Sequence, residues 1–272
     1  MEKVEIGTSP YAIYVDQRDQ RAQWLIKAKG MTQPEITEFW RRSVMSLKPK
    51  VVLDIGMNYG EILFSTEYEP TTKIIGIEAN EDLEPFIKKS ISNHPNSDQI
   101  QTIFALASNE EKGKHPFFVS SKWTGTSSAI LNGDSRYYKR KSVQSITVDS
   151  ILVSSDLKNE NVLFKIDVEG YEDKVMKGMT SVLNDANHAI GCIEFASAAM
   201  KKAGSNLQEF LDWLKTSFSI HINGGNNSLF ALSQPSLARL QEYYQKDEFH
   251  TDLFLFSNQK QPEEMGYKVT VL

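Results

Sequence analysis

The sequence has little cysteine and few long apolar stretches. Cys192 is the only cysteine among 272 residues, so an internal disulfide framework is excluded. It lies in the apolar run 189–195, where a thiol usually acts as a small buried hydrophobe. No stretch reaches the ~20 apolar residues that span a bilayer, and the first residues lack the apolar core of a signal peptide. These absences predict a soluble, cytoplasmic protein without a membrane partner.

An excess of positive charge is also missing. The chain has 30 Lys and Arg against 35 Asp and Glu, which gives a formal net charge of -5. A charge of this sign provides no general field that would attract nucleic acid. None of the five histidines has the spacing of metal ligands. The composition therefore favours a small-molecule partner over nucleic acid, assigns no residue to a metal, and leaves the oligomeric state open.

From residue 51 onward, short runs rich in Val, Ile and Phe alternate with longer amphipathic stretches. This alternation is typical of βαβ units around a parallel sheet. Several runs lack strict apolar and polar alternation, as strands covered on both faces do. We therefore expect an α/β fold with a doubly wound, mostly parallel seven-stranded sheet, helices on both faces and the last strand antiparallel. The expected strands are 50–56, 73–79, 100–107, 161–168, 189–195, 218–223 and 252–257.

Apolar residues at helical spacing predict helices between these runs. A further helix is expected at 31–47, where Thr32 and Glu35 fit a capping box, and it should pack over the ligand edge of the sheet. The polar segment 108–145 is too long for an ordinary connection, so we expect a functional loop there. The other expected helices are 59–68, 81–93, 169–185, 206–217 and 236–249.

The first expected strand runs directly into a turn that contains Asp54, Gly56, Asn58 and Gly60. Gly56 and Gly60 let the backbone approach a ligand closely, at the strand end where such sheets bind ligands. The turn lacks the second glycine of the G-x-G-x-x-G fingerprint, which disfavours a dinucleotide and a nicotinamide-dependent oxidoreductase. Asp54 either contacts the ligand or braces the turn by accepting its backbone N–H groups.

A carboxylate ends the next expected strand. Glu78 is placed where it can accept hydrogen bonds from both hydroxyl groups of a ribose. A simple tight turn would explain the two glycines, and a solvated strand end would explain Glu78. Their occurrence on consecutive βα units instead favours a ligand that contains a nucleoside.

Two groups of segments resemble known methyltransferases. VLDIGMNYG (52–60) and IGIEAN (75–80) resemble the first two motifs of class I S-adenosylmethionine-dependent methyltransferases. FALAS (104–108), SITVDSIL (145–152) and above all FKIDVEGYE (164–172) resemble the signature of the FkbM methyltransferase family, over about residues 50–257. The resemblance implies that S-adenosylmethionine is the cofactor and S-adenosylhomocysteine the product. It also implies that Gly56, Asn58, Gly60 and Glu78 bind the cofactor.

The adenine end of the cofactor is expected at the third strand. This strand ends Leu106-Ala107-Ser108 without the carboxylate that many class I enzymes have there. We therefore expect backbone and apolar contacts to adenine from Ala79, Ala107 and Ser108. The domain organisation expected from the resemblance is an N-terminal extension with a helix that packs on the core (1–48), a methyltransferase domain (49–258) and a C-terminal tail (259–272).

Alternation along the fourth expected strand puts Lys165, Asp167 and Glu169 on one face, unless regular pleating ceases before Glu169, which would then face elsewhere. Burial of an unpaired charge costs several kcal/mol, so we expect Lys165 to pair with one of the carboxylates. Asp167 should also contact the cofactor, and Asp167 or Glu169 is the candidate general base. Lys165 would orient the acceptor or tune the base. A purely structural ion-pair cluster that supports the Gly170 turn is the alternative.

Glu194 ends the following strand and should join the same acidic cleft. With Asp167 it could bind a divalent ion through oxygen atoms, but metal dependence is not favoured, because acidic clusters at strand ends are common in this architecture. The 108–145 segment supplies aromatic and hydroxyl groups suited to a sugar-like acceptor. The expected acceptor-binding residues are Trp123, Thr126, Ser127, Ser128 and Glu194.

The leading hypothesis is O-methylation of a small hydroxylated acceptor, a sugar moiety or a secondary metabolite, since FkbM members act mainly on sugar and polyketide hydroxyls. A catalytically silent adapter that keeps the fold and the cofactor is one alternative, and the buried charges argue against it. An N-methyltransferase is another. The sequence lacks the Asn/Asp-Pro-Pro-aromatic element that many amino-methylating relatives carry after the fourth strand. The identity of the acceptor stays open.

Overall fold

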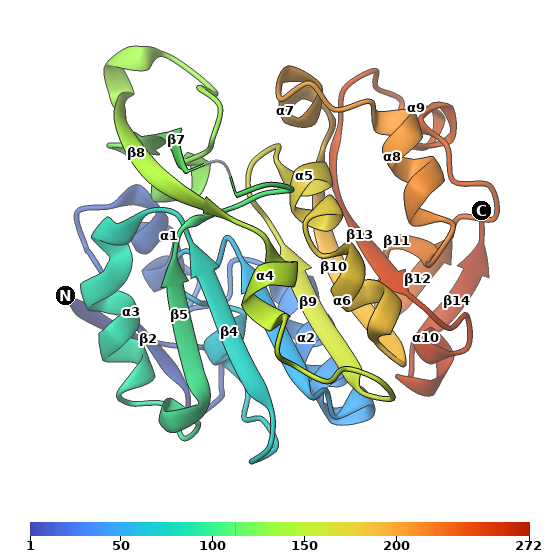
Figure 1. The fold of residues 1–272 in the computed structure, drawn as a ribbon, viewed down its shortest axis with the longest axis horizontal. Helices are drawn as coiled ribbons and strands as arrows, with labels where there is room; N and C mark the ends of the chain where they lie inside the picture. The colour runs from blue at the N-terminus through green and yellow to red at the C-terminus, as the bar shows by residue number, and fades with distance from the viewer. Residues whose placement is uncertain (112) are drawn as a thin grey trace.

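A nine-stranded sheet crosses the centre of the molecule (Figure 1) in the computed structural model, which describes residues 1–111 and 113–272. Its parallel part consists of β3 (Val51–Ile55), β4 (Lys73–Glu78), β5 (Ile100–Phe104), β9 (Asn161–Ile166) and β10 (His188–Ala196). The remainder consists of β11 (Ser219–Gly225), β12 (Ser228–Ala231), β13 (His250–Phe256) and β14 (Lys268–Val271). The strand order is β14-β12-β11-β13-β10-β9-β3-β4-β5.

The expected fold class is confirmed, with one difference in strand number. β13 is antiparallel to both of its neighbours, β10 and β11, as expected of the last of the seven long runs. The expected number of seven is wrong because β12 and β14 extend the sheet beyond β11. Both added strands have only four residues, and β14 is largely exposed. β12 has only three consecutive apolar residues and β14 alternates with polar ones, so neither gives an apolar run as long as those of the central strands.

The strand order reverses between β3 and β9. From β3 the chain proceeds to β4 and β5 on one side, and it then returns to β9 on the other side of β3. The three strands are in register, so that Ile55 lies opposite both Ile77 and Ile166. Their carboxyl ends therefore meet at one edge of the sheet. In doubly wound sheets, ligands bind at this switch point.

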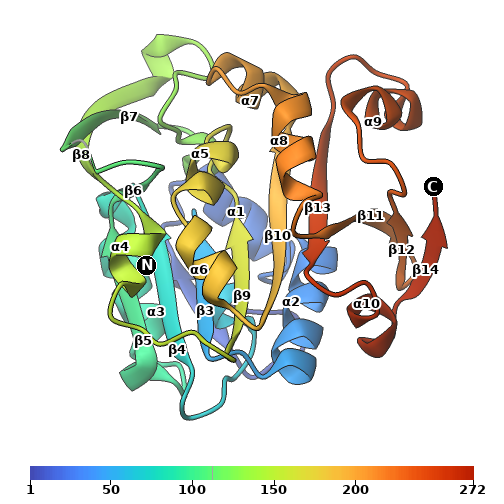
Figure 2. The same cartoon turned by 45° about the vertical axis from the view of Figure 1, so that its right-hand side comes forward.

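Helices cover both faces of the sheet (Figures 1 and 2). Side chains alternate between the faces along each strand, so Leu53 belongs to one apolar cluster and Val52 to the other. The first face is covered by α4 (Val148–Leu152), α5 (Glu172–Lys177), α6 (Thr180–Asp185), α7 (Ser197–Lys202), α8 (Leu207–Leu214) and α9 (Leu237–Tyr244). The second is covered by α1 (Gln20–Lys27), α2 (Pro34–Leu47) and α3 (Glu84–Ile91). α10 (Gln261–Glu264) precedes β14.

The helix expected at 59–68 does not form. Only a single 3-10 turn, η1 (Leu63–Ser65), follows the glycine turn. The Tyr68 hydroxyl donates to the backbone oxygen of Leu63 (2.6 Å) and accepts a hydrogen bond from Trp40 Nε1 (2.8 Å). The carbonyl that the next helical turn would use is thus bound by a side chain, and Thr66 is extended (φ -151). Tertiary contacts here override the helical periodicity of the sequence.

The helix expected at 169–185 is divided in two. α5 ends before Gly178, and α6 begins at Thr180. A Cβ atom on Gly178 would lie 2.0 Å from the backbone oxygen of Ser108, so the chain passes too close to this neighbour for any other residue. Close packing, rather than a polar loop, accounts for the break.

The N-terminal helix forms as α2, but its expected capping box is wrong. Gln33 is the N-cap residue and makes no side-chain cap hydrogen bond. Thr32 instead donates its hydroxyl to Glu61 Oε2 (2.6 Å), because the start of α2 is tied to the segment after the glycine turn. Phe39 and Trp40 are fully buried, so α2 packs firmly on its sheet face.

The segment 108–145 is not the long loop that we expect from its polarity. β7 (Lys114–Ser120) and β8 (Tyr138–Ile146) form an antiparallel pair, and β6 (Leu106–Ala107) adds to β8. Figure 2 shows this arm projecting beyond the ends of the central strands. Phe117, Val119 and Val143 form its small core. The connection between β7 and β8 contains η4 (Thr124–Thr126) and η5 (Ser135–Tyr137).

Smaller elements complete the chain. β1 (Glu2–Glu5) pairs with β2 (Ala12–Val15), which packs against α3. The 3-10 turns η2 (Glu81–Leu83) and η3 (Ser97–Gln99) flank α3. Across the described ranges on either side of residue 112, every helix is too short or too polar to pass through a bilayer.

Candidate functional site

A cavity opens at the switch point, above the carboxyl ends of the central strands. Its walls are the glycine turn after β3, the ends of β4, β9 and β10, the arm between β7 and β8, and the N-terminal segment. The polar and charged residues that line it are Arg21, Gln33, Asn58, Glu61, Glu78, Thr124, Ser127, Lys165, Asp167, Glu169 and Glu194. Gly56, Met57, Ala79, Ala105, Leu106, Ala107, Phe117 and Trp123 are among the others.

Most of the residues expected at the site thus come together, and five of them do not line the cavity. Those five are Asp54, Gly60, Ser108, Thr126 and Ser128. Gly60 donates its N–H to the Met57 oxygen (2.7 Å) within the turn, and Ser108 is buried beneath β8.

The glycine turn owes its shape to three residues with positive φ. Gly56 (φ +76) and Gly60 (φ +83) adopt a conformation that other residues rarely reach, and Asn58 (φ +49) tolerates it because its short polar side chain bonds locally. Asn58 Oδ1 accepts a hydrogen bond from the Tyr59 N–H (3.0 Å), and Asn58 Nδ2 donates to Thr124 Oγ1 (3.2 Å). The turn is therefore fixed both internally and to the β7–β8 arm.

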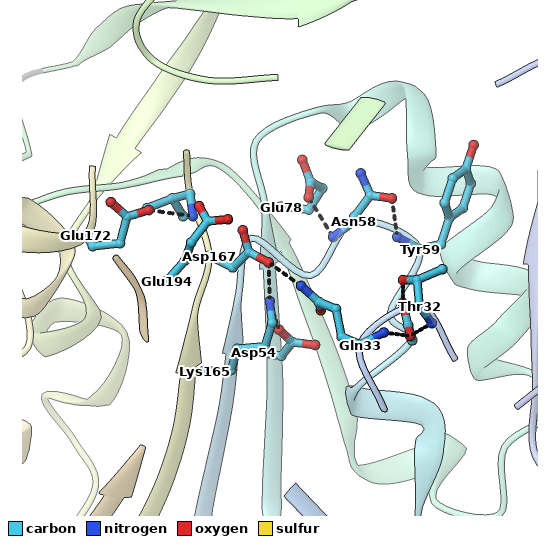
Figure 3. Close-up of polar contacts among 12 residues, drawn as sticks. Thr32, Gln33, Asp54, Asn58, Tyr59, Glu78, Lys165, Asp167, Glu172 and Glu194 are labelled. Atoms are coloured by element: carbon cyan, nitrogen blue, oxygen red, sulfur yellow. Dashed lines mark hydrogen bonds and ion pairs between the residues drawn. The ribbon is translucent and has the colours of Figure 1, made fainter. Parts of the chain in front are cut away.

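Glu78 is bound to the glycine turn across the strand ends (Figure 3). Its Oε2 accepts the Asn58 N–H (2.8 Å), and its Oε1 accepts the Asn80 N–H (2.7 Å). Burial raises the pKa of Glu78, while these two hydrogen bonds act to lower it. Each carboxylate oxygen has a second lone pair, so Glu78 can still accept from a ligand in the cavity.

Lys165 lies between two carboxylates beneath the cavity (Figure 3). Its Nζ is 3.2 Å from Asp167 Oδ2 and 3.6 Å from Asp54 Oδ1, which confirms the expected pairing. Burial acts to lower the pKa of Lys165, but the charges of Asp167 and Asp54 raise it above its usual value. Asp54 faces Lys165 across the β3–β9 register and is 1% exposed. It makes no hydrogen bond to the N–H groups of the turn, so the bracing role considered for it is not seen.

The chain leaves the regular strand before Glu169. β9 ends at Ile166, and Glu169 has φ +56, which is uncommon for a residue with a Cβ. Glu172 Oε1 accepts the N–H groups of Val168 and Gly170 (both 3.1 Å), and Ser128 Oγ donates to the Glu169 backbone oxygen (2.9 Å). These contacts hold the loop in the shape that turns the Glu169 side chain toward the cavity.

Three carboxylates converge on the far side of the cavity from Glu78. One oxygen from each of Asp167, Glu169 and Glu194 lies within 4.8 Å of the other two. Glu194 is the expected member from β10, and its Oε1 is 2.8 Å from His250 Nε2. Oxygen atoms of this kind are the ligands that hard divalent ions prefer, so these three residues could hold such an ion.

The carboxylates of this cluster differ in basicity. Burial opposes ionisation of Asp167, but the positive charges of Lys165 and Arg21 outweigh it and lower its pKa. Burial and the neighbouring Glu194 and Asp167 carboxylates raise the pKa of Glu169 well above its usual range. Burial and Asp167 also raise the pKa of Glu194. The cluster thus combines an ionised carboxylate with more basic ones, as acid–base sites do.

The β7–β8 arm contributes an aromatic wall at the mouth of the cavity. Trp123 and Ser127 line the cavity, whereas Thr126 Oγ1 donates back to the Trp123 oxygen (3.0 Å). The Trp123 ring lies 5.3 Å from the ring of Trp24, whose side chain is 56% exposed. Of the expected acceptor residues, Trp123, Ser127 and Glu194 therefore face the cavity, and Thr126 and Ser128 support it.

Several residues that line the cavity were not predicted from the sequence. Arg21, Gln33, Glu61 and Phe117 lie outside the motifs, and no local spacing marks them. Glu172 does carry a signal, because it is the last residue of FKIDVEGYE. His250 reaches Glu194 only through the antiparallel pairing of β13 with β10. A strand pairing of that kind cannot be read from a local motif.

Comparison with known protein families gives one match over most of the chain. Residues 54–269 match the model described as the methyltransferase FkbM domain. The match covers the glycine turn, Glu78 and the acidic cluster, and it begins after α2. No curated protein matches the chain.

Solved structures give distant similarities. The precorrin-6y C5,15-methyltransferase from Geobacter metallireducens GS-15 is 13% identical with a TM-score of 0.41, over 91% of this chain and 98% of that one. The O-methyltransferase from Bacillus cereus in complex with SAH is 10% identical with a TM-score of 0.44, over 87% and 88%. TomG from Streptomyces achromogenes, an O-methyltransferase in complex with SAM, is 7% identical with a TM-score of 0.41, over 90% and 92%.

Proposed function

Because the chain belongs to the FkbM methyltransferase family, we propose that it methylates a hydroxyl group of a small molecule with S-adenosylmethionine as the donor. The acceptor class that we favour is a sugar moiety or a secondary metabolite. The observation that carries the proposal is the position of the acidic cluster. Asp167, Glu169 and Glu194 lie in the same cavity as Glu78 and the glycine turn. A nucleoside site and a set of candidate bases thus share one enclosed space.

The residues of the cavity suit this cofactor. Glu78 keeps free lone pairs for the ribose hydroxyls, and Gly56 leaves backbone exposed for close approach. Ala79, Ala105, Leu106, Ala107 and Phe117 form an apolar region for the adenine. The third strand, β5, ends at Phe104 and not at Ala107 as expected, because Leu106 and Ala107 pair with β8 instead, and the residues from Ala105 to Ser108 include no carboxylate. When bound, the cofactor supplies an electrophilic methyl group on a sulfonium.

We assign the role of general base to Glu169 rather than to Asp167. An alcohol loses its proton during or after attack, so the base must be ionised and yet as basic as possible. Asp167 is held by Lys165 and Gln33, and its pKa is lowered. Glu169 has a raised pKa and faces the cavity. Asp167, oriented by Lys165, is then suited to position the acceptor hydroxyl.

The aromatic wall supports a sugar-like acceptor. Sugars present apolar C–H faces and hydroxyl edges, and aromatic rings pack against such faces. Trp123 and Thr124 line the cavity, and the Trp123 ring packs against the ring of Trp24. The site therefore offers a ring for the sugar face and carboxylates for its hydroxyl edge.

The proposal is tested by transfer of a labelled methyl group from S-adenosylmethionine to a panel of free sugars, nucleotide sugars, glycosylated metabolites and matched amines. We expect label on a hydroxylated acceptor and its loss in Glu169→Gln, by about 10²–10⁴-fold. The Gln variant should still bind S-adenosylhomocysteine. Label on amines alone would contradict O-methylation and favour the N-methyltransferase alternative. Binding of the cofactor without transfer to any acceptor would favour the silent adapter.

A further inference from the structure

Arg21 enters the cavity from a part of the chain that precedes the family match. It lies in α1, whereas the match begins at residue 54. Asp19 fixes the start of this helix, since its side chain accepts the N–H of Arg21 (3.1 Å). The same carboxylate accepts the N–H of Thr124 (3.1 Å) and the hydroxyl of Tyr59 (3.0 Å). The backbone of Arg21 is thereby fastened to the glycine turn and to the β7–β8 arm.

The guanidinium of Arg21 is held on one side and faces the cavity on the other. Its Nη2 donates to Glu61 Oε2 (2.9 Å), and its Nη1 donates to Thr32 Oγ1 (2.7 Å). Glu61 is 4% exposed, so this end of the contact is rigid. An arginine side chain has five N–H donors, and these contacts use two of them. Donors in a fixed orientation therefore remain for a ligand.

Within the described residues, Lys165 is the other cation that lines the cavity. Its ammonium group is occupied by Asp54 and Asp167, and its side chain is 5% exposed. The side chain of Arg21 is 16% exposed and has one carboxylate partner, Glu61. Of these two cations, Arg21 is therefore the one with donors left for an anionic ligand group.

The order of the strands indicates which part of the ligand Arg21 faces. Glu78 ends β4, Asp167 follows β9, and the Gly56 turn of β3 lies between them. With the ribose at Glu78 and the reacting methyl group near Asp167, the amino-acid portion of the cofactor lies along this turn. Figure 3 shows Thr32 and Gln33 close to this turn, near Asn58 and Tyr59. Thr32 accepts a hydrogen bond from Arg21, and the Gln33 N–H donates to Glu61.

We propose that Arg21 binds the α-carboxylate of the methionine portion of the cofactor, so that the N-terminal segment completes a site that the family match does not cover. A guanidinium fixed by a buried carboxylate pairs with a second carboxylate through its remaining donors. This inference rests on the proposed function, because it requires the cofactor in this cavity.

The test compares two ligands that differ in the amino-acid portion. S-adenosylhomocysteine carries the α-carboxylate, and 5′-methylthioadenosine keeps the adenine, ribose and sulfur but lacks it. Isothermal titration of the full chain with both ligands is made on the wild type, Arg21→Met and Arg21→Lys. Arg18→Met is the matched control, since Arg18 is three residues away, is 89% exposed and pairs with Asp16. Thermal unfolding of each variant reports whether the fold is intact.

We expect Arg21→Met to weaken S-adenosylhomocysteine about ten- to a hundredfold and to change 5′-methylthioadenosine by less than about twofold. Arg21→Lys should recover part of the loss, and Arg18→Met should change neither ligand. Equal losses for both ligands, or no loss for S-adenosylhomocysteine, would overturn the role of Arg21. If the wild type bound neither ligand, the proposed function itself would fail, and the inference with it.

Discussion

The backbone oxygen of Asp167 lies in the space that a side chain on Gly56 would occupy. A Cβ atom at Gly56 would be 1.8 Å from that oxygen, and the Asp167 N–H donates to the Ile55 oxygen (3.0 Å). The glycine turn and the charged end of β9 are therefore in direct contact. The two sequence motifs describe one site, and the glycine is required by the neighbouring strand as well as by the ligand.

Replacement of Gly56 by Ala should damage both stability and cofactor binding. The Cβ atom meets backbone at a positive φ (+76), so β3 and β9 must separate. We expect a loss of about 1–3 kcal/mol in the free energy of unfolding, measured with urea. Gly204→Ala is the control, because Gly204 has φ +87 and nothing within 4 Å of the added Cβ. Equal losses in the two variants would show that the contact with Asp167 contributes nothing.

Glu78→Ala should weaken the cofactor through its nucleoside end. The carboxylate holds the Asn58 and Asn80 N–H groups and is our ribose ligand. We expect a loss of about 1.5–3 kcal/mol in binding free energy by isothermal titration. Unlike a change at Arg21, this loss should be equal for S-adenosylhomocysteine and 5′-methylthioadenosine, which share the ribose. Unchanged affinity for both ligands would remove Glu78 from the site.

Lys165→Met should destabilise the fold strongly, because it leaves Asp54 buried without its cation. Removal of one partner of a buried ion pair costs about 3–5 kcal/mol. The double variant Asp54→Asn with Lys165→Met should recover part of this loss. Lys88→Met is the control, since Lys88 forms an exposed pair with Glu84, and its replacement should cost about 0.2–0.5 kcal/mol. Additive losses in the double variant would mean that Asp54 and Lys165 do not interact.

The pH dependence of methyl transfer should report Glu169. Burial and the carboxylates of Glu194 and Asp167 raise its pKa, so the fraction in the basic form, and with it kcat/KM, should rise with pH. The midpoint of this limb should lie above the ~4.3 of an unperturbed glutamate. Glu194→Gln removes one negative neighbour and should move the midpoint to lower pH. A limb that persists unchanged in Glu169→Gln would assign it to another group.

The sequence allowed the central strands and their ligand edge to be predicted, because buried parallel strands produce apolar runs that are visible locally. β12 and β14 have four residues each, β7 has a short apolar group within a polar segment, and β8 is largely polar, so none of them forms such a run. The helix expected at 59–68 fails because Tyr68 binds the Leu63 oxygen. That contact depends on tertiary structure, which periodicity does not contain.

The residues of the candidate site likewise fall into those that the sequence predicts and those that depend on tertiary contacts. Gly56, Glu78 and Asp167 follow strands directly, so the topology of a parallel sheet brings them together. Arg21 and Glu61 reach the cavity only because the start of α2 is tied to the segment after the turn. Thr126 and Ser128 lie in the expected segment but do not line the cavity, because their hydroxyl groups donate to the backbone oxygens of Trp123 and Glu169.

Titration of the full wild-type chain with S-adenosylhomocysteine tests the central claim most directly. The cavity at the switch point predicts saturable binding of one molecule per chain, together with no measurable binding of a nicotinamide dinucleotide. Absence of binding of S-adenosylhomocysteine at high micromolar concentration would contradict the account.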